Sequence, residues 1–407
     1  MHISVVLFCF RAVLEAVVGI LMRITTRMSF EEIPMVNCAN TIFNKRVVQH
    51  MQPTLERFVP APWAPWGCSQ TVFSQCAQIS RESKFPYTRR QHVRAADGVE
   101  LHIDWKEKPD MLEDTLLVIV LHGIGGSSAS KVARITCDMA MDRGWRSAVY
   151  VRRGHGDSSL LPQPPLSDGC IVGGAARVKS FPMHCDLDDM NTIIRCVQIA
   201  FPSAPKVIVG FSAGANVVVK YLGSGITIPP QIIAAVSVCN GHELVSLTRE
   251  YTHRPAVNAL MTSALQSVLK KRSAEVKRIA EVRGVALDFG RLFGTKDVRE
   301  FDEMLMLPLY RQFTTIDEYY AFNSCHTAFG QISTPLLCMA ALDDPLIRSD
   351  LSEHAVCASA KNSNIISVIT ERGGHLGWLT GWSGVWWQQD LIFSYITSVY
   401  DMYLCSS

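Results

Sequence analysis

Short apolar runs recur along this chain of 407 residues, and stretches with helical periodicity separate most of them. These runs lie at residues 115–123, 147–153, 206–212, 231–240, 334–342 and 364–370. An almost continuous apolar run is typical of a strand that is buried on both faces of a parallel sheet. The alternation therefore predicts an α/β fold with a doubly wound, mostly parallel sheet, and such sheets bind ligands beyond the carboxyl ends of their strands.

The composition excludes several classes of protein. A hydrophobic fraction of 48% and a charged fraction of 19% are ordinary for a globular protein and exclude a disordered or coiled-coil chain. The net charge of +2 indicates no clustered basic face, so no nucleic-acid partner is expected. The thirteen cysteines include no Cys-x-x-Cys pair, and the chain contains no Asn-x-Ser/Thr sequence. We therefore expect reduced thiols in an intracellular protein that is not secreted.

The pentapeptide Gly-Phe-Ser-Ala-Gly at residues 210–214 stands between a predicted strand and a predicted helix. In this setting the glycines permit a sharp turn, and Ser212 is presented at the N-terminus of the helix. A serine at its ordinary pKa is a weak nucleophile, so it needs a base and a residue that orients the base. In hydrolases with this turn, these residues follow in the order Ser, Asp or Glu, His.

Candidates for both partners follow the last two predicted strands. Asp343 and Asp344 follow one strand, and His375 follows the next after two glycines. We choose Asp344 as the orienting carboxylate, because the step from Asp344 to Pro345 matches the usual turn after this strand. Asp343 is expected to shape the loop beside the substrate site. The sequence therefore predicts Ser212, Asp344 and His375 as the catalytic residues.

A glycine-rich loop with the sequence His-Gly-Ile-Gly-Gly begins at His122, after the first buried strand. Its backbone can supply the N–H of Ile124 to an oxyanion, and Ala213, which follows the nucleophile, can supply a second N–H. His122 is expected to hold this loop beside the substrate rather than to transfer protons. The loop lacks the spacings that bind phosphates, and no close metal-ligand set is present, so neither a cofactor nor a metal is expected.

Residues 3–22 are apolar and about long enough to span a bilayer, but Arg11 and Glu15 interrupt them. Each large apolar residue contributes about −0.3 to −0.6 kcal/mol to insertion, and each charge costs up to about 3.5 kcal/mol, so the sum is close to zero. Arg11 and Glu15 can pair on one face of a helix, because they are four residues apart. Three interpretations stay open: a membrane anchor or in-plane helix, an extension upstream of a start at Met28, and a buried helix.

Several segments follow one another in a characteristic order: PYTRRQHVRAADGVELHIDW, LHGIGGSS, YVRRGHGDSSLLP, VGFSAGANVVVKYL, and AALDDPLI with GGHLGW. In this order they resemble the α/β-hydrolase-domain lipase and esterase family, over roughly residues 58–395. That family includes membrane-associated acylglycerol and phospholipid hydrolases, yeast ethyl-ester synthases and bacterial esterases. The resemblance implies an acyl ester or lipid as the substrate, with Ser212 as the nucleophile and Asp344 and His375 as its relay partners.

The chain is expected to divide into four parts. Residues 1–57 form an N-terminal segment and linker, residues 58–245 and 332–407 form two parts of the hydrolase core, and residues 246–331 form a helical cap. Cap helices with apolar inner faces would bind acyl chains. Trp378 lies close to the predicted base, which makes it a candidate neighbour of the substrate, although packing of the core is the simpler role for it.

Two other functions are weighed against ester hydrolysis. The His-x4-Asp spacing of His184 and Asp189, which is discussed as an acyltransferase signature in some relatives, leaves transfer to an alcohol as one alternative. A catalytically inactive hydrolase fold that binds a lipid or a protein is the other, and the complete set of three catalytic residue types argues against it. The chain departs from the family between Pro162 and Phe181, where a Gly- and Pro-rich insertion predicts a loop near the site.

Overall fold

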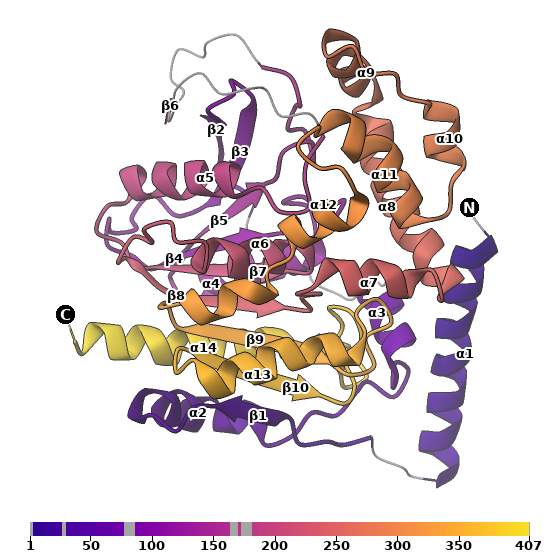
Figure 1. The fold of residues 1–407 in the computed structure, drawn as a ribbon. Helices are drawn as coiled ribbons and strands as arrows, with labels where there is room; N and C mark the ends of the chain where they lie inside the picture. The colour runs from indigo at the N-terminus through magenta and orange to yellow at the C-terminus, as the bar shows by residue number, and fades with distance from the viewer. Residues whose placement is uncertain (1–2, 27–29, 77–85, 163–169, 172–180, 407) are drawn as a thin grey trace.

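The computed structural model describes residues 3–26, 30–76, 86–162, 170–171 and 181–406. Its centre is a sheet with the strand order β1-β10-β9-β8-β7-β4-β5-β3-β2-β6 (Figure 1). Neighbouring strands from β10 to β5 are parallel, which confirms the predicted α/β fold with a mostly parallel sheet. These parallel strands are β4 (Leu117–Leu121), β5 (Arg146–Val151), β7 (Lys206–Phe211), β8 (Ile232–Val238), β9 (Leu336–Ala341) and β10 (Ile365–Thr370).

Alternation along each strand divides the apolar core between the two faces of the sheet. In β4, Val118 and Val120 belong to the core on one face, whereas Leu117 and Ile119 belong to the core on the other. The first core includes residues of α2 (Ile42–Leu55), α4 (Lys131–Asp142) and α14 (Trp387–Leu404), and the second includes residues of α5 (Leu187–Ala200), α6 (Ala213–Leu222) and α13 (Glu353–Lys361). Because successive side chains of a strand point to opposite faces, a continuous apolar run fills both cores.

A hairpin of β2 (Arg89–Arg94) and β3 (Glu100–Lys106) extends the sheet beyond β5, and the short strand β6 (Cys170–Ile171) pairs with β2. The two strands of the hairpin are antiparallel and join at an Asp-Gly turn, where Gly98 has a φ of +81°. The side chain of Asp97 accepts a hydrogen bond from Arg153 at 2.8 Å. A buried ion pair therefore connects this turn to the segment that follows β5.

Part of the N-terminal segment belongs to the core of the fold. The short strand β1 (Met35–Cys38) pairs antiparallel with β10, and α2 packs against α14. The sequence instead predicts a linker here, because four half-exposed residues at a sheet edge show no alternation of apolar and polar side chains.

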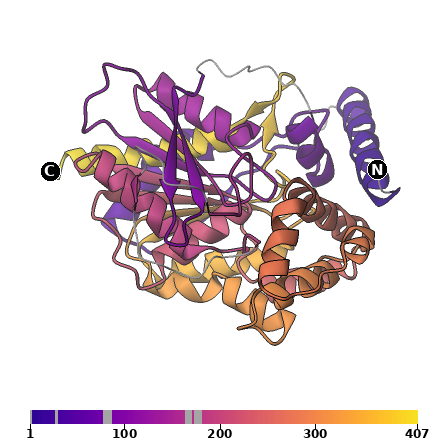
Figure 2. The ribbon, with the colours of Figure 1, turned by 90° about the horizontal axis from the view of Figure 1, so that it is seen from above.

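Helix α1 (Ile3–Thr26) lies along the outside of the molecule, against α3 (Gly67–Cys76) and α8 (Pro255–Lys271) (Figures 1 and 2). Arg11 Nε donates to Glu15 Oε1 at 3.1 Å, which confirms the predicted pairing, and the other carboxylate oxygen of Glu15 accepts from the Ser69 N–H at 2.8 Å. Among the helices of the described residues, none is both long enough and apolar enough to cross a bilayer.

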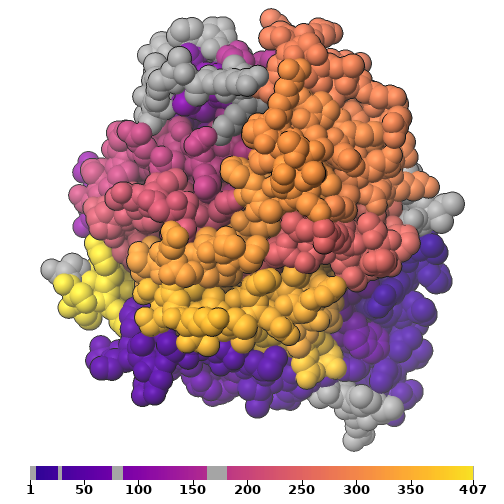
Figure 3. Space-filling view, viewed as in Figure 1, coloured from indigo at the N-terminus to yellow at the C-terminus, as the bar shows by residue number. Residues whose placement is uncertain are grey.

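The chain between β8 and β9 folds into helices that share an apolar core of their own. These are α7 (Leu244–Tyr251), α8 (Pro255–Lys271), α9 (Ser273–Val282), α10 (Phe289–Gly294), α11 (Val298–Leu309) and α12 (Ile316–Asn323), and we call them the inserted helices. Seen from above, most of them gather at one side of the sheet (Figure 2), and in the space-filling view they form much of one side of the molecule (Figure 3). The insertion expected as a loop between Pro162 and Phe181 lies, apart from residues 170–171, outside the described residues.

Candidate active site

Ser212 lies in a sharp turn between β7 and α6, and its φ is +54°. A positive φ is strained for a residue with a side chain and is often found at catalytic turns. A Cβ on Gly210 would lie 2.6 Å from the carbonyl oxygen of Gly214, and a Cβ on Gly214 would lie 2.4 Å from that of Leu121. Close packing of strand and helix therefore requires both glycines of the pentapeptide.

The three residues predicted to be catalytic meet at the carboxyl ends of β7, β9 and β10. His375 Nε2 lies 2.9 Å from Ser212 Oγ, and His375 Nδ1 lies 2.8 Å from Asp344 Oδ2. The backbone N–H groups of Leu346 and Ile347 donate to Asp344 Oδ1 at 2.7 and 2.9 Å. With Nδ1–H directed to the fixed carboxylate, Nε2 is the ring nitrogen that can accept the serine proton.

The loop that carries His375 is held by side chains from distant parts of the chain. The backbone N–H of His375 donates to Thr71 Oγ1, and that of Gly374 donates to Asp343 Oδ1, both at 2.8 Å. Asp343 thus contacts the backbone of this loop, whereas Asp344 contacts the imidazole. Burial raises the pKa of Asp343 to about 7.

Both residues predicted to supply the oxyanion hole border the nucleophile. Ala213 is the first residue of α6, where a backbone N–H has no acceptor within the helix. Ile124 lines the same cavity as Ser212. A Cβ on Gly123 would lie 3.2 Å from the Cβ of Ser212, so the glycine-rich loop passes directly beside the serine.

His122 holds the glycine-rich loop in place through two hydrogen bonds. Its Nδ1 donates to the carbonyl oxygen of Gly123 at 2.8 Å, and its Nε2 accepts from the backbone N–H of Arg152 at 3.2 Å. Burial lowers the pKa of His122 to about 3, so the ring is neutral and both nitrogens are engaged. His122 does not itself line the cavity.

A cavity of about 650 Å³, including its mouth, opens beside Ser212 and His375. The inserted helices and the loop after β9 supply most of its wall, through apolar side chains that include Leu247, Tyr251, Met261, Leu265, Val298 and Ile347. The cavity can therefore hold an apolar chain next to the nucleophile.

Asn216 adds an unpredicted polar group to this wall. The residue is 3% exposed; its Nδ2 donates to the carbonyl oxygen of Asn323 at 2.8 Å, and its Oδ1 is buried without a partner among the described residues. A signal was present in the sequence, because Asn216 follows Ser212 by four residues and shares its helix face.

His184 also lines the cavity, but its partner is not the one that the sequence spacing suggested. His184 Nε2 lies 2.7 Å from Asp302 Oδ2, which also accepts from the hydroxyl of Tyr320 at 2.8 Å. Asp189 instead accepts from Arg153 Nε at 2.7 Å. Two residues that are 118 positions apart form this pair, so no local spacing could have identified it.

Trp378 lies outside the cavity wall. The residue is fully buried, its indole N–H donates to Thr370 Oγ1 at 2.8 Å, and its ring leaves no room for a Cβ on Gly373. It packs the core beneath the loop, which is the simpler of the two roles considered for it.

Cys239 was not predicted from the sequence to be a site residue, although it lies beside Asp344 and His375. The backbone N–H of Leu376 donates to its Sγ at 3.4 Å, and the residue lines the cavity. Burial raises the pKa of Cys239 well above its ordinary value, so the thiol stays protonated next to Asp344.

The chain is similar to several known proteins. A hydrolase family model described as "Serine aminopeptidase, S33" matches residues 113–376. Monoacylglycerol lipase ABHD2 of Danio rerio is 24% identical over 89% of this chain and 85% of its own length. Phospholipase ABHD3 of Homo sapiens is 24% identical over 91% of this chain and 84% of its own. Among solved structures, the esterase Pf2001 of Pyrococcus furiosus is 16% identical over 72% of this chain and 85% of its own, with a TM-score of 0.44.

Proposed function

Because this chain belongs to the α/β-hydrolase-domain lipase and esterase family and is a carboxylic ester hydrolase, we propose that Ser212, His375 and Asp344 cleave lipid-like acyl esters through an acyl-enzyme. The observation that carries the proposal is the continuous contact from Ser212 Oγ to His375 at 2.9 Å and from His375 to Asp344 at 2.8 Å. Ser212 and His375 border a cavity with mainly apolar walls.

In the first step, His375 Nε2 takes the proton of Ser212 as the serine oxygen bonds to the ester carbonyl carbon. Asp344 stabilises the imidazolium that forms. The N–H groups of Ile124 and Ala213 donate to the oxyanion, and each such donor is worth on the order of 3 kcal/mol. The bond from carbon to the alcohol oxygen then breaks, and the alcohol leaves with the proton from His375.

In the second step, a water molecule replaces the alcohol. His375 takes a proton from the water as its oxygen bonds to the acyl carbon, and the same two N–H groups receive the oxyanion. The bond between that carbon and Ser212 Oγ breaks, the serine regains its proton, and the carboxylic acid leaves. None of these steps requires a metal or an organic cofactor.

The cavity offers different surroundings for the acyl part and the alcohol part of the substrate. We assign the acyl chain to the wall formed by the inserted helices, and we propose residues 246–331 as the cap of the enzyme. We assign the alcohol part to Asn216 and His184. An unpartnered buried acceptor such as Asn216 Oδ1 costs about 1–3 kcal/mol, and a substrate hydroxyl would remove that cost, which favours an acylglycerol over a simple ester.

We also propose that α1 lies in the plane of a lipid surface. One face of this helix packs on the protein through Phe8 and Ala12, and most of the remaining surface exposes large apolar side chains. These exposed residues are Val6, Leu7, Phe10, Val13, Leu14, Val17, Val18, Leu21 and Ile24. A contiguous apolar face of this kind is typical of membrane-surface helices, and it would place the cavity close to lipid substrates.

Replacement of the nucleophile tests the proposal. Ser212→Ala is expected to abolish labelling by a fluorophosphonate probe and to lower the hydrolysis of synthetic esters and monoacylglycerols by at least about 1,000-fold. Ser246→Ala, on the exposed start of α7, is the matched control and keeps both activities. Full hydrolysis by Ser212→Ala would overturn the proposal.

The same assays separate the two other functions. A product analysis with ethanol or glycerol present distinguishes release of the free acid from transfer to an alcohol. An inactive binding module would leave the wild-type protein unlabelled by the probe.

A further inference from the structure

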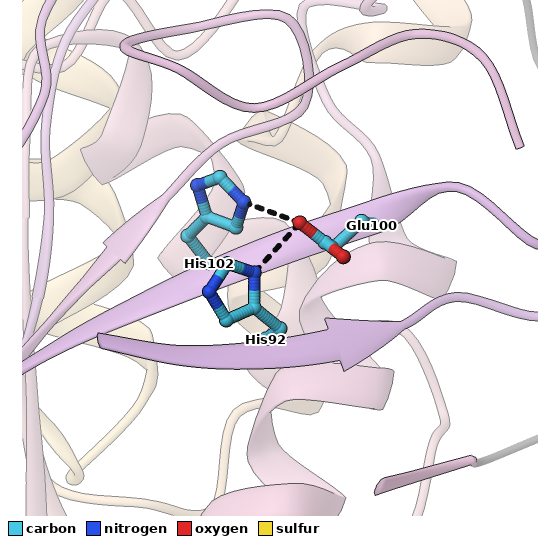
Figure 4. A group of neighbouring side chains, drawn as sticks. All are labelled: His92, Glu100 and His102. Atoms are coloured by element: carbon cyan, nitrogen blue, oxygen red, sulfur yellow. Dashed lines mark hydrogen bonds and ion pairs between the residues drawn. The ribbon is translucent and has the colours of Figure 1, made fainter. Parts of the chain in front are cut away.

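Two histidines and a glutamate converge on one face of the β2–β3 hairpin (Figure 4). His92 of β2 and His102 of β3 are directly opposite in the strand register. Glu100 precedes His102 by two residues and therefore points to the same face of β3. None of the three lines the catalytic cavity, so this group is separate from the site described above.

The atoms of this group that could bind a metal lie close to one another. Glu100 Oε1 lies 2.7 Å from His92 Nδ1 and 2.9 Å from His102 Nε2. The two imidazole rings are 4.9 Å apart at an angle of 74°, so their nitrogens approach the carboxylate from different directions (Figure 4). One ligand atom from each residue lies within 4.8 Å of the other two.

Against the expectation from the sequence that no metal is bound, we propose that His92, Glu100 and His102 bind a divalent transition-metal ion such as Zn²⁺. Two imidazole nitrogens and one carboxylate oxygen suit Zn²⁺, with a water in the fourth position, whereas Mg²⁺ and Ca²⁺ prefer sites made of oxygen alone. Tetrahedral bonds of about 2.0–2.2 Å place ligand atoms about 3.4 Å apart, so the carboxylate oxygen and the nitrogens, now 2.7 and 2.9 Å from it, need to separate by about 0.7 Å for His92 and about 0.5 Å for His102. His92 is half exposed and can make this movement.

Two arginines of β2 lie on the same face as His92, and Arg94 is directly opposite Glu100 in the strand register. Arg90 lies on the same face of β2, but its guanidinium is paired with Asp104 at 2.6 Å and with Asp157 at 3.2 Å.

The bound ion would cross-link the two strands near one edge of the sheet. His102 Nδ1 has no partner within the described ranges, and a missing support of this kind typically weakens metal binding by about 10- to 100-fold. We therefore assign the ion the role of an exchangeable cross-link between β2 and β3. It stabilises the hairpin and has no part in ester cleavage.

Metal-stripped full-length protein tests this assignment through stoichiometry and thermal unfolding. Zn²⁺ is expected to bind in equilibrium dialysis and to raise the unfolding temperature, since a ligand of the folded state stabilises it. Co²⁺ is expected to give the absorption bands of a low-coordinate site. His92→Ala and Glu100→Gln should each remove one equivalent of bound metal and most of the temperature rise, and neither should change ester hydrolysis without metal.

His354→Ala is the matched control, because His354 lies 5.2 Å, ring to ring, from His326 and could bind metal elsewhere. It should keep the temperature rise. Zinc that binds at Cys239, Asp344 and His375 would inhibit hydrolysis equally in all variants and is thereby distinguished. If His92→Ala and Glu100→Gln bind as much metal as the wild type, with the same rise, the proposed site is wrong whatever the outcome for Ser212.

Discussion

Two neighbouring aspartates play different parts beside the base. Asp344 accepts hydrogen bonds from His375 and from two backbone N–H groups. Asp343 accepts from the Gly374 N–H through Oδ1, while its Oδ2 is buried without a partner in the described part of the chain. Burial, together with the nearby charge of Asp344, raises the pKa of Asp343 to about 7. When Asp343 is protonated, it adds no second negative charge beside His375.

This raised pKa predicts a loss of stability as the pH rises. Because the folded-state pKa of about 7 lies above the ordinary value of 3.8, the folded protein binds the proton more tightly, and stability falls between about pH 4 and pH 7. Asp343→Asn should therefore unfold at a higher temperature than the wild type at pH 8, with little difference at pH 4. Circular dichroism melts at pH 4, 6 and 8 measure this difference.

The exposed Asp110 provides the control, since Asp110→Asn should leave the pH dependence unchanged. Glu32, whose pKa burial also raises to about 7, contributes to the slope in both variants. A difference between Asp343→Asn and the wild type that is the same at every pH would contradict the prediction.

Helix α1 has one face that packs on the protein and one face that exposes large apolar side chains. A sum of hydropathy over the whole helix does not distinguish them. Small residues face the protein: Ala12 and Ala16 are buried, and a Cβ on Gly19 would lie 2.5 Å from Pro65. The carboxylate of Glu15, on this side, binds the backbone of α3 through Ser69. Glu15, whose charge opposes a membrane span, thus fastens α1 to α3, and the large apolar residues lie on the outer face.

The outer face of α1 should determine binding to lipid. Phe10 and Leu14 are 64% and 53% exposed, and burial of each in lipid contributes about 1.5–3 kcal/mol. Phe10→Glu combined with Leu14→Glu should lower partitioning onto phosphatidylcholine vesicles by at least about tenfold, measured by flotation. Ile199→Glu, at an exposed apolar residue of α5, should not. Equal flotation of all three proteins would contradict the membrane role of α1.

The cavity is a property of the whole molecule. Ser212 comes from the turn after β7, His375 from the loop after β10, and much of the apolar wall from helices inserted between β8 and β9. The length of acyl chain that fits therefore depends on how the inserted helices pack on the core. Met261 of α8 lies in this wall, partly exposed to the cavity.

Met261→Trp should narrow the cavity and shorten the preferred acyl chain. We expect kcat/KM for a 16-carbon ester to fall about tenfold relative to that for a 4-carbon ester, because loss of a few methylene contacts costs about 1–3 kcal/mol. A chain-length series of synthetic esters measures the ratio. Val282→Trp, at an exposed residue of α9, is the control. A uniform decrease for all chain lengths would show that Met261 does not contact the acyl chain.

The sequence by itself determined the parallel strands, the serine turn and the candidates that follow the strand ends. These features depend on local periodicity and on chain order, which also placed Asp344 and His375 at the same edge of the sheet as Ser212. Only the tertiary structure decided that β1 completes the sheet, that His184 pairs with Asp302, and that Asn216 Oδ1 is left without a partner. The physical reason is that such contacts join residues far apart in the chain, and the packing of the helices on the sheet, rather than any spacing, sets which of them meet.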